Sequence, residues 1–112
     1  MAQGSTQASA QTQVQTVLLR ECSWVIRVFD SSGNDVKPST MEINRTGRFE
    51  AWSLPNKAII ATVDPFHDED VDAYRVVFYC YNGSSIRRIG IVLVPNPEDV
   101  VSHVKDALTR CQ

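Results

Sequence analysis

The sequence predicts an α+β domain: a mostly antiparallel sheet of six to seven strands, packed by one C-terminal amphipathic helix. Short runs of β-branched and aromatic residues alternate with turn residues from position 17 to position 94. A proline-containing helix start and a single apolar stripe occupy positions 96–111. A sheet with one face to cover and a helix with one stripe to bury complement each other, which favours this fold class.

The strand runs are short, and glycine, asparagine or proline separates most of them. Pro38 lacks a backbone donor, so the segment 36–43 is expected at an edge of the sheet. Asn82 and Gly83 predict a hairpin turn. The expected strands lie at 17–19, 24–29, 40–44, 48–54, 58–63, 74–81 and 85–94.

The helix has a start signal and a periodic face. Asn96 is a favoured residue before a helix, and Pro97 suits the first helical position because its missing N–H needs no partner there. Apolar residues then recur at the helical period, which indicates one buried face. The residues of this stripe are Val100, Val101, Val104, Ala107, Leu108 and Cys111.

This order of elements resembles the pleckstrin-homology-like superfold. In that superfold a bent antiparallel sheet or partly open barrel is closed at one end by a final helix. The resemblance covers about residues 16–111, rests on element order, and implies a fold of that kind. The stretch 74–111 is also similar to the opening of ubiquitin-like folds. The run from hairpins into a helix is similar to the coat proteins of small RNA phages.

Composition limits the organisation and the function classes. The 112 residues fit one globular domain at 14–112, after a polar tail at 1–13 that is expected to be disordered. The net charge of -2 argues against a nucleic-acid partner. No apolar run is long enough for a transmembrane segment. No basic segment followed by an apolar run opens the chain, which predicts a cytoplasmic protein.

No motif for chemistry stands out, so the sequence predicts no enzyme, no cofactor and no metal site. Gly-rich phosphate loops and nucleophile elbows are missing from the sequence. Cys22, Cys80 and Cys111 are widely spaced, and we expect small buried thiols in a reducing compartment. The acidic stretch 64–72 is expected to be a solvated loop, with an interaction surface or a divalent-cation site as alternatives.

Aromatic residues are the leading candidates for a binding site. If Val76 and Phe78 face the helix, alternation turns Tyr79 and Tyr81 the other way, and Trp52 is likewise expected to face outward. Outward aromatics beside arginine are typical of interaction surfaces. The alternative is a sheet covered on both faces, by a partner subunit or by the N-terminal strand. The candidate partner-binding residues are Trp52, Tyr79, Tyr81, Arg75, Arg87 and Arg88.

These observations predict a small non-enzymatic interaction domain of the adaptor or scaffold type. It would dock a peptide or a partner strand on its sheet, with 36–43 as the edge for strand addition. The partner is expected to be another protein or the chain itself, as a homodimer. The alternative is a self-assembling structural protein, such as a viral coat or accessory subunit. An enzyme or metal protein built on the acidic stretch is a third class.

Overall fold

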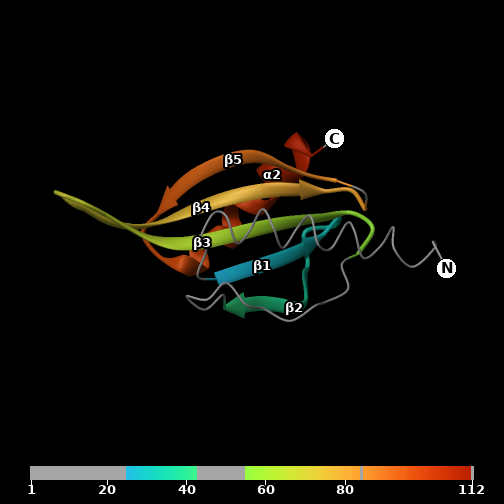
Figure 1. Ribbon diagram of the computed structural model, residues 1–112, viewed down its shortest axis with the longest axis horizontal. Coiled ribbons are helices and arrows are strands. Elements are labelled where there is room, and N and C mark those ends of the chain that lie inside the picture. The colour runs from blue at the N-terminus through green and yellow to red at the C-terminus, as the bar shows by residue number, and fades with distance from the viewer. Residues whose placement is uncertain (1–24, 43–54, 84, 112) are drawn as a thin grey trace.

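The computed structural model describes residues 25–42, 55–83 and 85–111, and these form an open antiparallel sheet with a helical segment behind it (Figure 1). The strand order is β2-β1-β3-β4-β5, and every neighbouring pair is antiparallel. The strands are β1 (Val25–Asp30), β2 (Asp35–Glu42), β3 (Ala58–Asp68), β4 (Val71–Tyr81) and β5 (Ile86–Val94).

The sheet and the C-terminal helix confirm the expected fold class in its coarse form. Five strands are described, so the predicted six to seven are not confirmed, and the sheet is open rather than closed. The expected strands at 17–19 and 48–54 and the tail at 1–13 lie outside the described residues. β2 and β5 are the two edges of the described sheet, which confirms that the segment carrying Pro38 is peripheral.

The helical segment has two parts where the sequence predicted one continuous helix. A 3₁₀ helix, η1 (Pro97–His103), leads into α2 (Val104–Arg110). Pro97 opens η1 as expected, but Asn96 makes no side-chain capping hydrogen bond. In the tighter 3₁₀ winding Val101 turns to solvent and is 50% exposed, so its place in the buried stripe was wrong. Neither described helix is long and apolar enough to cross a membrane.

The helix packs on one face of the sheet and forms the larger core there. Val100, Val104 and Ala107 are buried against the central strands, as the apolar stripe predicted. Tyr74, Val76 and Phe78 of β4 point to this side, which confirms the expected alternation along β4. The sheet residues buried in this core are Phe29, Ile59, Ala61, Val63, Val76, Phe78 and Val94.

The opposite face is also a buried core. Its residues are Ile26, Val28, Ala58, Ile60, Val77, Tyr79 and Tyr81. Tyr79 and Tyr81 do face away from the helix, but they are only 1% and 4% exposed. Because the structure holds one chain, this burial lies within the monomer. The expectation that these tyrosines are exposed anchors is therefore wrong. β3 and β4 are apolar on both faces, which is typical of strands covered on both sides.

Residues 64–72 form the end of a long hairpin rather than a loop. The β3–β4 register runs without interruption from Ala58↔Tyr81 to Asp68↔Val71, and Glu69 and Asp70 make the turn. The predicted loop was wrong because it was based on the carboxylates of this stretch, and solvated carboxylates are as compatible with an exposed two-stranded ribbon as with a loop. His67 and Asp72 pair across the ribbon, with Nδ1 2.8 Å from Oδ1.

The β1–β2 turn depends on one carboxylate. The Oδ1 atom of Asp30 accepts hydrogen bonds from the backbone N–H groups of Ser32 and Asn34, each at 2.9 Å. Gly33 adopts φ +88, which only glycine enters without strain. The bond from the Asn34 backbone is the main reason that the pKa of Asp30 lies below its ordinary value of 3.8.

This turn predicts a pH dependence. The lowered pKa of Asp30 means that its stabilising contribution is present above the ordinary value and is lost as pH falls through the folded-state value. We expect Asp30→Ala to lower the thermal midpoint at pH 7 and to have a smaller effect well below pH 3. Thermal unfolding of both proteins across pH 2–7 measures this. A constant difference over that range would contradict the assignment.

Candidate protein-interaction site

Two of the four large apolar residues that are exposed in the described part of the chain lie together at one edge of the sheet. Ile91 and Leu93 lie two positions apart on β5, on the face away from the helix, and are 51% and 50% exposed. Their neighbours across the ladder are Val77, which is buried, and Arg75, which is half-buried. β5 is an edge strand, so a partner strand placed beside it would contact both side chains.

β5 also borders a groove on the helix side. The β4–β5 register shifts between Phe78 and Tyr79, so that Ile89 is an extra residue and both Ile89 and Gly90 lie on this side. A Cβ atom on Gly90 would stand 3.1 Å from Nη1 of Arg110, so the guanidinium lies close against the Gly90 backbone. The groove is lined by Phe78, Ile89, Gly90, Ile91, Val92, His103, Asp106, Ala107 and Arg110.

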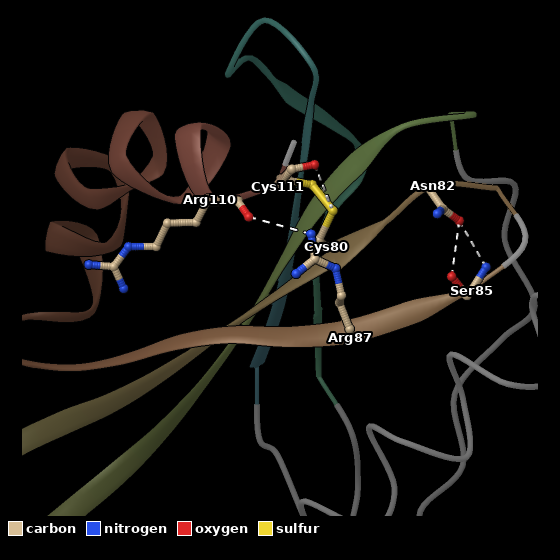
Figure 2. The surroundings of a disulfide bond; sticks show 6 residues. All are labelled: Cys80, Asn82, Ser85, Arg87, Arg110 and Cys111. Atoms are coloured by element: carbon tan, nitrogen blue, oxygen red, sulfur yellow. Dashed lines mark hydrogen bonds between the residues drawn. A yellow bond between two sulfur atoms is a disulfide. The ribbon is translucent and has the colours of Figure 1, made fainter.

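The far wall of this groove is α2, and its C-terminal end is fixed to the sheet (Figure 2). A disulfide joins Cys111, just after α2, to Cys80 on β4, with Cα atoms 5.3 Å apart. Arg87 of β5 extends toward the same corner, and its Nη2 donates to the Arg110 carbonyl oxygen at 3.5 Å. The disulfide holds the C-terminal end of the helix against the sheet. The Arg87 contact places positive charge at that end, where the free carbonyl groups of the helix favour it.

The disulfide corrects the expectation of free thiols for Cys80 and Cys111. The predicted positions of Cys80 in a buried strand and of Cys111 at the end of the apolar stripe are confirmed. The pairing was missed because a separation of 31 residues carries no motif, and only the docking of the helix brings the two residues together. Cys22 lies outside the described residues.

The polar side chains of the groove come from α2 and η1. Arg110 and Asp106 form an i,i+4 ion pair at 3.2 Å, with both side chains more than half exposed. His103 closes η1 and is half-buried beside them. An exposed pair of this kind contributes little to stability, so Arg110 can exchange its partner for an incoming carboxylate at small cost.

The arginines expected to form one patch lie on different faces. Arg75 and Arg88 are on the face away from the helix, opposite Leu93 and Tyr79 respectively. Arg87 is opposite Cys80 and points to the helix side. The structure therefore brings Arg87 to Arg110 rather than to Arg75. Tyr79 and Tyr81 are in the core, and Trp52 lies outside the described residues.

Sequence reasoning missed Ile91 and Leu93. The run 89–94 is apolar throughout, which is typical of a buried central strand, so nothing in it marked one face as exposed. The exposure of these residues follows from the position of β5 at an edge of the described sheet, which the local pattern does not indicate.

The acidic hairpin shows no metal-binding arrangement. Among residues 25–42, 55–83 and 85–111, no three His, Cys, Asp or Glu side chains converge as ligands of one ion would. The exposed carboxylates are distributed over the end of β3, the turn and the start of β4.

Comparison with known proteins yields no relative. No protein-family model matches the chain, and neither the curated proteins nor the solved structures contain a significant match. The fold and the site define an α+β domain with an exposed apolar edge strand beside a groove walled by α2.

Proposed function

We propose that the protein is a small, non-enzymatic interaction domain that receives an extended partner segment along the edge of β5. In this mode the partner pairs its backbone with the free side of the edge strand, while pockets on either side take alternate side chains. Ile91 and Leu93 would contact side chains on one face, and the groove beside α2 would take those on the other.

The observation that carries this proposal is the exposure of two large apolar residues, Ile91 and Leu93, on an edge strand. Edge strands normally carry charge or proline that prevents pairing, and β5 does so only in its first half, with Arg87, Arg88 and the bulge at Ile89. The second half is regular and apolar. It therefore suits strand addition better than the other edge, β2, which contains Pro38.

The disulfide bears on the compartment. Disulfides persist in oxidising compartments and are rare in the cytosol. We propose that the protein works where Cys80 and Cys111 stay bonded, in place of the cytoplasmic location expected from the sequence. Blocking free thiols in intact cells before lysis, followed by mass spectrometry, distinguishes the two. Unblocked, bonded cysteines support an oxidising compartment, and blocked ones support the cytoplasm.

Selection from a displayed library of random peptides tests the function directly. We expect selected peptides to bind the wild type, and Ile91→Lys with Leu93→Lys, the edge variant, to weaken that binding at least tenfold. Val101→Lys is the matched control, because Val101 is equally exposed but lies on η1. The proposal fails if no peptide is selected, or if the edge variant and the control bind equally well.

A further inference from the structure

The β3–β4 hairpin extends beyond the rest of the sheet as a narrow two-stranded arm (Figure 1). β1 pairs with β3 only as far as Val63, and β5 pairs with β4 only as far as Tyr74. Residues 64–73 form the arm, and they have no third strand beside them in the described sheet. A two-stranded ribbon is marginal in water, so an arm of this kind gains stability when it rests on another surface.

The arm carries concentrated negative charge. Asp68, Glu69, Asp70 and Asp72 are exposed, and the Asp72 side chain is 88% accessible. Val71, at 45% exposure, adds an apolar contact beside them. On the β3 side Pro65 removes a backbone donor, whereas the β4 side presents ordinary residues from Val71 to Ala73. The β4 side of the arm is therefore the one able to pair with another strand.

The opposite end of the same strands carries positive charge next to the candidate site. Arg87 lies opposite Cys80 at the far end of β4, and Arg110 lies next to it at the end of α2. Nine residues separate Cys80 from Val71 along β4, or about 30 Å of extended strand. The acidic arm and the basic corner are thus too far apart to meet within one molecule.

We propose that the occupant of the β5 edge is the acidic arm of a second copy of this chain, so that copies join head to tail. This inference rests on the proposed function and names its partner. The arm's carboxylates would face Arg87 and Arg110, and Val71 would lie against the apolar half of β5. The contact is heterologous, because each copy offers a different surface to each neighbour, and it continues beyond a dimer. The net charge of -2 opposes such stacking only weakly.

Light scattering across a hundredfold concentration range tests the assembly. We expect the wild-type mass to rise beyond twice the 12.5 kDa of one chain at low salt and to fall at high salt. Asp68→Lys with Asp70→Lys, the arm variant, and the edge variant are each expected to stay at 12.5 kDa. Glu98→Lys, an exposed acidic residue outside the arm, is the matched control and should assemble like the wild type.

Mixing the two variants gives the sharpest outcome. The arm variant keeps an intact β5 edge and the edge variant keeps an intact arm, so an equimolar mixture should form a one-to-one heterodimer and nothing larger. A wild-type monomer at every concentration, or a dimer that survives in the arm variant, would overturn the inference. After either of these outcomes, binding of selected peptides at β5 would leave the proposed function intact and refute only self-assembly. Loss of peptide binding as well would refute both.

Discussion

Replacing Cys111 with serine is expected to lower the free energy of unfolding by about 3–4 kcal/mol, because the disulfide closes a loop of about 31 residues in the unfolded chain. Cys111 is the better site for substitution, since Cys80 is only 5% exposed and its loss would also disturb packing. A loss of this size is a large fraction of the stability of a small domain.

Urea unfolding with and without reductant measures the effect. Reductant should lower the midpoint of the wild type to that of Cys111→Ser and should leave the variant unchanged. Cys22→Ser is the control and should retain the full sensitivity to reductant. Equal midpoints for the wild type and Cys111→Ser under oxidising conditions would show that the bond between Cys80 and Cys111 does not contribute.

Truncating Tyr79 to alanine is expected to destabilise the fold by about 3–5 kcal/mol, as for other large buried aromatics. Tyr79 is 1% exposed and packs with Ile60 and Val77 on the face away from the helix. The substitution removes most of a large side chain from a core that cannot close the gap. Any loss of peptide binding by Tyr79→Ala should match the fraction of the variant that is unfolded.

Denaturant midpoints for Tyr79→Ala and for Ile91→Ala separate the core from the surface. Ile91 is 51% exposed, so its truncation should change the midpoint little while weakening the binding of selected peptides. If Tyr79→Ala remained as stable as the wild type and lost peptide binding, Tyr79 would belong to the interaction surface as first expected from the sequence.

The coarse fold was accessible from the sequence because its signals are local. Alternation along β4 placed Val76 and Phe78 toward the helix, and the spacing of Val100, Val104 and Ala107 identified the buried side of the helix. The peripheral position of Pro38 followed from a missing backbone donor. Each of these inferences needs only a few neighbouring residues.

The site was less accessible because it depends on what covers each strand. Tyr79 and Ile91 both face away from the helix in the structure, yet one is buried and the other is exposed, and alternation along a strand does not report that difference. The same limit explains the acidic hairpin, since charge reports contact with water rather than backbone conformation. The Cys80–Cys111 bond likewise required the tertiary arrangement.

Amide hydrogen exchange with a selected peptide bound is the most direct test of β5 as the receiving edge. Strand addition supplies new acceptors to the outward N–H groups, so their exchange should slow between Ile86 and Val94. The amides of β2, from Asp35 to Glu42, are the internal control and should be unaffected. Slowed exchange in β5 alone is the predicted result. Slowed exchange in β2, with β5 unchanged, would contradict the account and place the partner on the opposite edge.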